Sequence, residues 1–204
     1  MPVPCAAEPA DPLQFLRVAA QGASLATHQD LWRWLRGEVQ ALLPHELFLA
    51  AWGDFRAGMV QVDLVSSLPG LRTGQARAAR WLPLAHYLRD CWVAAQHAPC
   101  QVDVHGCAGL CAPPGSGAAA VAPDPALGCL RTAVVHGTRE AVPAGERVFA
   151  ALTWRARADE AQPRALQLLV PFIDTALRRM PPLAEAGRLH AQAALPPSAA
   201  SNAS

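Results

Sequence analysis

The order of helical and strand patterns along the chain predicts an α+β protein, in which a five-stranded, mostly antiparallel sheet is flanked by helices. Apolar residues recur at helical spacing in 31–43 and again in 166–177. Residues 47–52 are wholly apolar, and residues 60–64 alternate between apolar and polar side chains, as strands do. The predicted order is helix, helix, two strands, helix, three strands, helix.

Composition and charge limit the classes of protein to consider. The chain has 204 residues, of which 52% are hydrophobic and 16% are charged, so it can bury a core and is not a disordered protein. Its net charge of +1 provides no field that would attract nucleic acid or an anionic membrane. No apolar run is long enough to span a bilayer, and the N-terminus lacks the pattern of a signal peptide. We therefore expect a soluble cytoplasmic protein.

The N-terminal part is expected to begin with a flexible segment at 1–12, followed by a short amphipathic helix at 13–21. Thr27 has the side chain of an N-cap, and Asp30 follows it three residues later. A second helix should therefore start after Thr27 and continue until Pro44 ends its pattern.

The next two segments are expected to pair as an antiparallel hairpin. The wholly apolar segment 47–52 is typical of a central strand that is covered on both faces. Residues 53–58 supply two glycines and Asp54 for a turn, and residues 60–64 follow as the second strand.

The second half of the chain should add one more helix before the remaining strands. This helix is expected over 82–97, with Pro83 at its start, and a short strand follows at 100–105. Residues 106–128 contain Gly, Ala and Pro without a regular period, which indicates either a flexible insertion or a lid over a site.

The sheet should be completed by strands at 129–136 and 147–154, joined by a polar turn that begins at Gly137. A final helix is expected over 164–180. It contains Pro171, which should kink the helix or mark a restart.

Residues 13–182 are thus expected to form one domain of the GAF/PAS kind, a class of fold that is usually sensory. After this domain, residues 183–204 consist largely of Ala, Pro and Ser. They lack the apolar content needed to fold, so we expect a disordered linker or tail.

Five segments carry a resemblance to a known family: LWRWLRGEVQALLPHELFLAAWGDF at 31–55, VDLVSSLPGLRT at 62–73, LRTAVVHGTRE at 130–140, the strand that ends in Trp154, and LLVPFIDTALRRM at 168–180. Together they resemble the N-terminal sensory half of EpsA-type regulators of the LuxR family. Those regulators are associated with exopolysaccharide and exosortase (PEP-CTERM) gene clusters of Gram-negative bacteria. The resemblance covers residues 27–180, and PHELFLAAWGDF is its most distinctive part.

The resemblance implies a GAF-like sensory and dimerisation domain, not an enzyme, of a transcription regulator of exopolysaccharide biosynthesis genes. Family members continue through a Pro/Ala linker into a helix-turn-helix domain that binds DNA. This chain ends in the linker, which implies either a truncated regulator or a stand-alone domain. DNA would then be contacted only through a helix-turn-helix domain that is absent from this chain.

A GAF-like pocket needs aromatic walls and a few polar anchors, and six residues are candidates for contacts with an unidentified small molecule. They are Trp52, Asp63, Arg72, Trp92, His136 and Trp154. Tryptophans at helical or strand spacing more often belong to the core, and Arg72 could equally be solvated or paired in a salt bridge. The Trp, Tyr and Asp signature of LuxR lactone sensors is not matched here, since the single tyrosine, Tyr87, is on a helix.

Two sets of residues could support catalysis: His136 with Asp63 and a cysteine, or His45 with Glu46 and Asp54. His45 follows Pro44 closely, where capping or exposure is the simpler interpretation, and His136 closes an apolar strand. The alternative to a regulatory domain is a small enzyme with a reactive cysteine under the 106–128 loop.

The six cysteines are expected to be free thiols, because a core of this size needs no disulfides. They are Cys5, Cys91, Cys100, Cys107, Cys111 and Cys129. Cys107 and Cys111 with His105 could bind zinc, but no second ligand pair follows at matching spacing. We therefore expect neither a metal nor a cofactor.

A LuxR-type regulator must pair in order to place two recognition helices on DNA, so a homodimer is expected. The N-terminal and C-terminal helices that frame the sheet would provide the interface. Trp32 and Arg36, which lie off the apolar stripe of their helix, and Leu177, near the exit to the linker, are the candidate residues. Alternatively, the helix at 13–21 covers Trp32 in a monomer.

Overall fold

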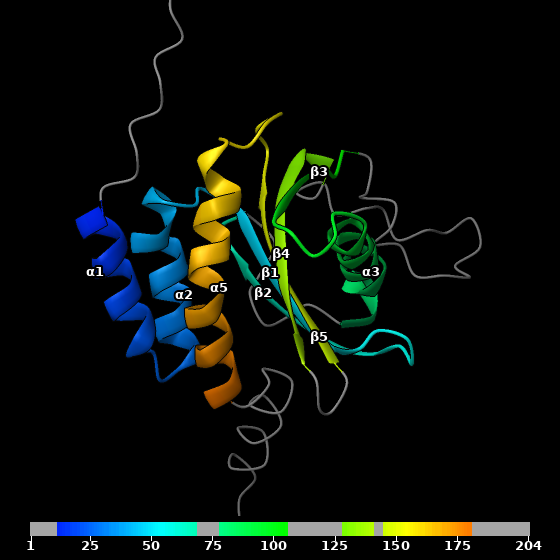
Figure 1. Ribbon diagram of the computed structural model, residues 1–204, viewed down its shortest axis with the longest axis horizontal. Helices are drawn as coiled ribbons and strands as arrows, with labels where there is room; N and C mark the ends of the chain where they lie inside the picture. The colour runs from blue at the N-terminus through cyan, green and yellow to red at the C-terminus, as the bar shows by residue number, and fades with distance from the viewer. Residues whose placement is uncertain (1–11, 69–77, 106–127, 141–144, 181–204) are drawn as a thin grey trace, which may run out of the picture.

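The fold is a sheet covered by helices on both faces, which confirms the predicted α+β class (Figure 1). The computed structural model describes residues 12–68, 78–105, 128–140 and 145–180. Within these residues five strands form one sheet in the order β2-β1-β5-β4-β3, and every neighbouring pair is antiparallel. The strands are β1 (Leu47–Asp54), β2 (Met59–Ser66), β3 (Cys100–Asp103), β4 (Thr132–Glu140) and β5 (Gly145–Thr153). The predicted flexible start, the insertion or lid after residue 105, and the predicted tail lie outside the described residues.

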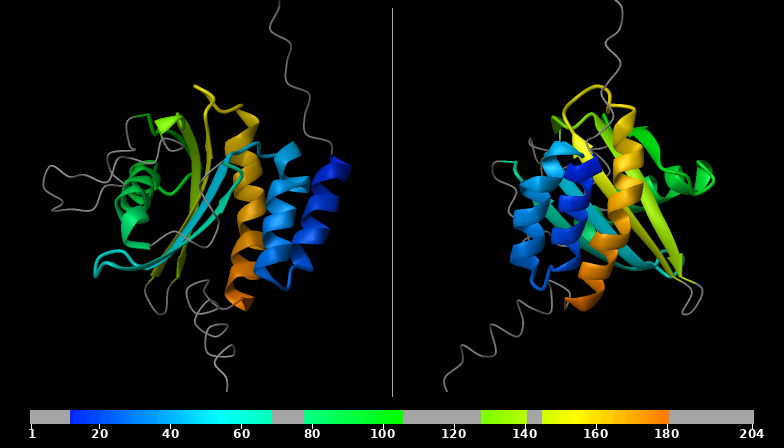
Figure 2. Two further views of the ribbon diagram at one scale, coloured as in Figure 1. Left: turned by 180° about the vertical axis from the view of Figure 1, so that it is seen from behind. Right: turned by 60° about the vertical axis from the view of Figure 1, so that its left-hand side comes forward.

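Two groups of helices cover the two faces of the sheet (Figures 1 and 2). On one face lie α1 (Pro12–Ala23), α2 (His28–Arg36) and α5 (Ala161–Arg179), and on the other lies α3 (Ala78–Ala94). We call these the three-helix face and the α3 face. A short 3₁₀ helix, η1 (Glu38–Ala41), leads from α2 toward β1. None of the described helices has both the length and the apolar character that crossing a membrane requires.

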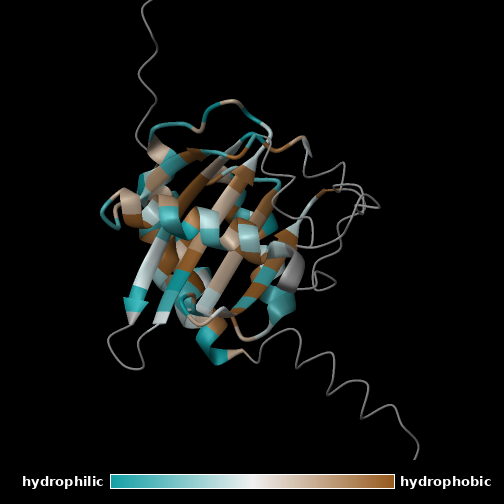
Figure 3. Ribbon diagram, turned by 90° about the vertical axis from the view of Figure 1, so that its right-hand side faces the viewer, coloured by the Kyte–Doolittle hydropathy of each residue, from teal (hydrophilic) through white to brown (hydrophobic). Residues whose placement is uncertain are grey.

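Strand β1 lies inside the sheet because its side chains are apolar in both directions. Leu47, Leu49 and Ala51 belong to the core of the α3 face, whereas Phe48 and Ala50 belong to that of the three-helix face. Figure 3, which looks toward the α3 face, shows the apolar residues along the strands. The covered position of β1 is therefore as predicted, although the middle strand of the sheet is β5.

The predicted N-cap is confirmed, but the predicted length of the second helix is wrong. The hydroxyl oxygen of Thr27 accepts a hydrogen bond from the backbone N–H of Asp30 at 3.1 Å. α2 ends at Arg36, because Gly37 leaves helical geometry with φ −108° and ψ −101°. Glycine is a poor helix former, so the chain continues from this point as the separate helix η1.

Pro83 does not begin the helix that contains it. α3 starts at Ala78, five residues earlier than Pro83, and continues past the proline to Ala94. Trp81 and Leu84, on either side of Pro83, are 0% and 3% exposed and pack on the sheet. This burial offsets the hydrogen bond that the proline removes.

The end of β4 also differs from the prediction, and of the two alternatives at Pro171 the restart is excluded. β4 continues through Gly137, which pairs with Val148 of β5, so the turn between these strands comes later. α5 runs without a restart through Pro171. Because Pro171 is exposed, the carbonyl group of Gln167 that loses its helical partner can bond to water. The hydroxyl group of Thr175 donates to the carbonyl oxygen of Pro171 at 2.7 Å.

Gly137 is required by two close approaches, one from the backbone of the neighbouring strand β5 and one from Trp92 of α3. A Cβ atom at this position would lie 2.5 Å from the carbonyl oxygen of Arg147 and 3.0 Å from the ring of Trp92. Gly137→Ala should therefore lower the free energy of unfolding by about 1–3 kcal/mol, as overpacking does in other cores. Gly128→Ala is the control, since its Cβ would meet nothing within 4 Å. Urea denaturation should show a lower midpoint for Gly137→Ala only, and equal midpoints would contradict the expectation.

His45 should make stability depend on pH, because it is buried in its neutral form. The side chain is 5% exposed, its Nδ1 donates to the carbonyl oxygen of Leu43 at 2.7 Å, and burial lowers its pKa to about 4. In the unfolded chain the ring takes up a proton near pH 6.5, so its contribution to stability is lost as the pH falls from 6.5 toward 4. Between pH 7 and pH 5 this loss should amount to about 2 kcal/mol.

His45→Asn tests this expectation, because its amide can still donate to Leu43 but does not titrate in this range. Urea denaturation at pH 7 and pH 5 should show a smaller decrease in stability for the variant than for the parent. An equal decrease in both proteins would assign the pH dependence to other groups.

Candidate functional site

The three-helix face contains a narrow pocket between α2, α5 and the sheet, which we call the α2–α5 pocket. α2 contributes His28 and Trp32 to it, the sheet contributes Phe48 and Asp63, and α5 contributes Ile173. Most of the lining is apolar. The free volume is about 10 Å³, which is room for about one water molecule.

Asp63 places a carboxyl group in the wall of this pocket. It lies on β2, where it faces the three-helix side while its neighbour Leu64 packs on the α3 side. Its Oδ2 is 3.5 Å from Nε2 of His28, and the two side chains are 11% and 14% exposed. Within the described structure this Oδ2 has no hydrogen bond of good geometry. A buried acid that is only partly satisfied can anchor a hydrogen-bond donor or a cation.

A second polar group on the same face ties α5 to the sheet. Nη1 of Arg147 on β5 lies 2.8 Å from Oδ1 of Asp174 on α5, and both side chains are 13% exposed. The Arg147 guanidinium also lies over the ring of Trp52, 5.5 Å from its centroid. The other carboxylate oxygen of Asp174 accepts a hydrogen bond from Arg178 at 2.9 Å. The ion pair between Arg147 and Asp174 therefore joins the sheet to α5.

The sheet separates the residues that the sequence suggested as ligand contacts. Trp52 and Asp63 are on the three-helix side, whereas Trp92 is 1% exposed in the core of the α3 side. The ring of His136 is 6.4 Å from that of Trp92, and burial lowers the pKa of His136. Trp154 is 56% exposed beyond the end of β5. Arg72 lies outside the described residues, and a binding role for each of the six remains a prediction.

Neither of the two candidate catalytic sets is brought together in full. Asp63 and His136 share a row of the sheet but are three strands apart, a separation of about 14 Å. His45 precedes β1, whereas Asp54 ends it. Glu46 accepts a hydrogen bond from the backbone N–H of Trp154 at 3.1 Å. Asp63 is therefore too far from His136, and Asp54, at the opposite end of β1, too far from His45, for the contact that general acid–base catalysis needs.

Three cysteines, Cys91, Cys100 and Cys129, belong to the described residues, and Cys91 and Cys100 are free thiols. Burial, together with the neighbouring Cys91, raises the pKa of the Cys100 thiol. A reactive cysteine requires the opposite shift. Within the described parts of the chain no three His, Cys, Asp or Glu side chains gather as metal ligands. The pair Cys107 and Cys111 lies outside those parts.

The residues suggested for a dimer interface differ in exposure. Arg36 is exposed, Trp32 is half-buried against the core, and Leu177 is only 6% exposed. Leu177 therefore does not fit a direct role in an interface. Exposed leucines are found instead on two neighbouring helices, namely Leu13 and Leu16 on α1 and Leu168 on α5, with 68%, 61% and 53% exposure.

Sequence analysis did not single out three residues of the three-helix face, namely His28, Arg147 and Asp174. For Asp174 a signal exists in the sequence, because it interrupts the apolar stripe of its helix, whereas Arg147 only precedes the apolar run of its strand. His28 carries no such signal, since its meeting with Asp63 depends on how α2 packs on β2.

In terms of fold and site, the chain is an α+β domain that holds buried polar pairs on one face of its sheet. No protein-family model matches the chain, and no curated protein matches it. Among solved structures, the chain is similar to the crystal structure of the N-acylhomoserine lactone-dependent LuxR family transcription factor CepR2 from Burkholderia cenocepacia. The two chains share 11% sequence identity with a TM-score of 0.43, and the match covers 81% of this chain and 92% of that chain.

In the ion pair between Arg147 and Asp174, removing one partner should destabilise the protein more than removing both. Asp174→Leu leaves the guanidinium of Arg147 buried without its carboxylate, at an expected cost of about 3 kcal/mol. The double variant Arg147→Met with Asp174→Leu should recover most of this loss, because no unpaired charge remains. Chemical denaturation of the three proteins measures both effects. A double variant less stable than Asp174→Leu would contradict this account of the pair.

Proposed function

We propose that the chain is the regulatory domain of a LuxR-type transcription regulator, with a GAF-like sensory and dimerising role over residues 13–182. Its targets would be exopolysaccharide biosynthesis genes, as the resemblance over 27–180 implies. The observation that carries a binding role is the pair His28 and Asp63, which faces an apolar pocket while the candidate catalytic groups are far apart.

The proposed ligand of the α2–α5 pocket is small and largely apolar, with one hydrogen-bond donor or cationic group for Asp63. The pocket as it stands holds about one water molecule, so the ligand must displace side chains. Trp32 is the side chain to move, since it is half-buried and belongs to the pocket wall. Binding would then favour one arrangement of α2 against α5.

The proposed homodimer uses the outer surface of α1 and α5. Three leucines, Leu13, Leu16 and Leu168, are more than half exposed there. Exposed apolar side chains on adjacent elements mark interaction surfaces more often than single ones do. Pairing through these helices supports the regulatory role, because a DNA-binding domain joined after α5, as in members of the family that the chain resembles, would be brought together with its copy as a pair.

A fusion experiment tests the regulatory role. The full chain, placed before a heterologous helix-turn-helix domain that represses only as a dimer, should repress a reporter gene. Leu16→Glu in the fusion should abolish repression, because a carboxylate would be buried at the interface. Met59→Glu is the matched control, since Met59 is 71% exposed but lies on β2.

Sedimentation equilibrium of the unfused chain at tens of micromolar should show a dimer that Leu16→Glu dissociates. Circular dichroism should confirm that the variants remain folded. A parent chain that remains monomeric, or a folded fusion that fails to repress the reporter gene, would contradict the proposed dimerising role.

A further inference from the structure

The charges in the wall of the α2–α5 pocket are out of balance. Ten of the described residues line the pocket, and Asp63 is the only one of them with a carboxylate, while none is an arginine or a lysine. His28 is the one other lining residue whose side chain can ionise. Both side chains are nearly buried, at 11% exposure for Asp63 and 14% for His28. The pocket therefore contains one buried acid and no permanent positive charge.

His28 satisfies Asp63 only in part. Its Nε2 atom lies 3.5 Å from Oδ2 of Asp63, and within the described structure this oxygen accepts no hydrogen bond of good geometry. A neutral imidazole can donate one hydrogen bond, but it cancels no charge. Asp63 thus keeps an open acceptor position in an apolar wall, where an unmatched charge is costly.

The arginines of the same face are engaged elsewhere. Arg147 and Arg178 both contact Asp174, at 2.8 and 2.9 Å, so the ion pairs that join α5 to the sheet use their guanidinium groups. Among the described residues Asp63 has an ion-pair contact with His28 alone. A cation that matches Asp63 must therefore come from a ligand.

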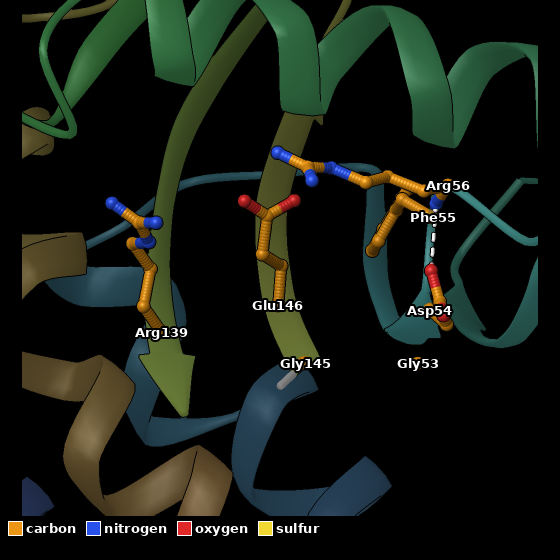
Figure 4. A pocket seen from close by; sticks show the side chains of 7 residues that line it. All are labelled: Gly53, Asp54, Phe55, Arg56, Arg139, Gly145 and Glu146. Carbon is orange, nitrogen blue, oxygen red and sulfur yellow. Dashed lines mark hydrogen bonds between the residues drawn. The ribbon is translucent and has the colours of Figure 1, made fainter. Parts of the chain in front are cut away.

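The larger pocket at the end of the sheet, which Figure 4 shows, differs because its charges are balanced. Two carboxylates face two guanidinium groups there, namely Asp54, Glu146, Arg56 and Arg139. Glu146 also binds Arg89 at 2.6 Å, and Arg89 is shared with Asp90 at 2.9 Å. Such a set selects neither an anion nor a cation, so the unbalanced acid of the α2–α5 pocket distinguishes that pocket from this one.

We infer that the α2–α5 pocket binds a protonated primary alkylamine, with its ammonium group against Asp63 and its alkyl chain among the apolar side chains. The free volume is about 10 Å³, which is room for one water-sized group such as an ammonium head group. An ammonium group donates up to three hydrogen bonds and carries the charge that the pocket lacks. The inference rests on the ligand-binding part of the proposed function, because it names the class of ligand for that pocket.

Trp32 controls the space for the alkyl chain. Its half-buried ring lines the pocket, and it is not among the buried residues of α2, which are Leu31, Trp34 and Leu35. Moving this ring out would open an apolar space beside the head-group position. A short alkyl chain fills such a space, since apolar cavities bind apolar groups.

Calorimetric titration of the full chain at neutral pH and constant ionic strength tests the inference. The probes are n-pentylamine, n-pentanol, which has the same alkyl chain without the charge, and hexanoate, which has the opposite charge. The amine should bind saturably with one site per chain, and the alcohol at least about tenfold more weakly, because hydrogen bonds between ionised groups are the stronger ones. Hexanoate should bind more weakly still. Equal affinities for the amine and the alcohol, or no saturable binding of the amine, would overturn the inference.

Variants assign the binding to Asp63. Asp63→Asn keeps the shape but not the charge, so it should weaken binding of the amine at least about tenfold and leave that of the alcohol unchanged. Asp90→Asn is the matched control, since this carboxylate lies on α3 at 65% exposure, and it should bind the amine like the parent. Unchanged affinity in a folded Asp63→Asn variant, or equal weakening in both variants, would overturn the inference.

Trp32→Ala provides an independent test, because it opens the space for the alkyl chain without changing a charge. It should strengthen binding of the amine at least about fivefold, since the ligand no longer has to displace the ring. Weaker binding in this variant, with its melting temperature showing that it is folded, would contradict the inferred position of the chain.

The inference and the proposed regulatory role can fail separately. A chain that dimerises and represses in the fusion but does not prefer the amine to the alcohol keeps the regulatory role and loses the amine. A chain that binds the amine through Asp63 but stays monomeric keeps the amine site and loses the dimerising role.

Discussion

The burial of β1 and β5 on both faces is the constraint on which the rest of the structure depends. Strands with apolar side chains in both directions cannot leave either face in water, so helices must cover both. Any polar side chain that remains in these layers must find a partner there. Arg147 of β5 meets Asp174, and Asp63 of β2 meets His28, so the polar pairs follow from the burial of the sheet.

The strand pattern was predictable because side-chain alternation is a local property of the sequence. The apolar run at 47–52 and the alternation after it specify a covered strand and its hairpin partner, and the structure pairs them in this way. Errors occurred where tertiary packing overrides a local signal. Pro83 lies well inside a helix, and Gly137 lies inside a strand, because packing against the sheet outweighs the local preference of each residue.

The site was less predictable, since residue type does not reveal the face of the sheet to which a side chain belongs. Trp52 and Trp92 looked equivalent in the sequence, yet they lie on opposite faces. For Arg147 the face can be predicted from the alternation of side chains along the strand. Arg147 lies two and four residues before Phe149 and Ala151, so it points to the same face as they do. The same holds for Asp174, which follows Ile173 on the buried stripe of its helix. The contact between His28 and Asp63 joins two separate elements, and no spacing rule encodes it.

Helix α5 takes part in both proposed activities of the three-helix face. Ile173, Asp174 and Leu177 face inward, toward the pocket and the ion pair, whereas Leu168 is exposed beside α1. A ligand that shifts α5 by contacting its inner side therefore also shifts part of the proposed dimer surface. Linkage makes such an effect reciprocal, so pairing of two copies must change the affinity for the ligand by the same factor. One helix that contacts both partners is the simplest physical route by which binding inside this domain could control how two copies pair.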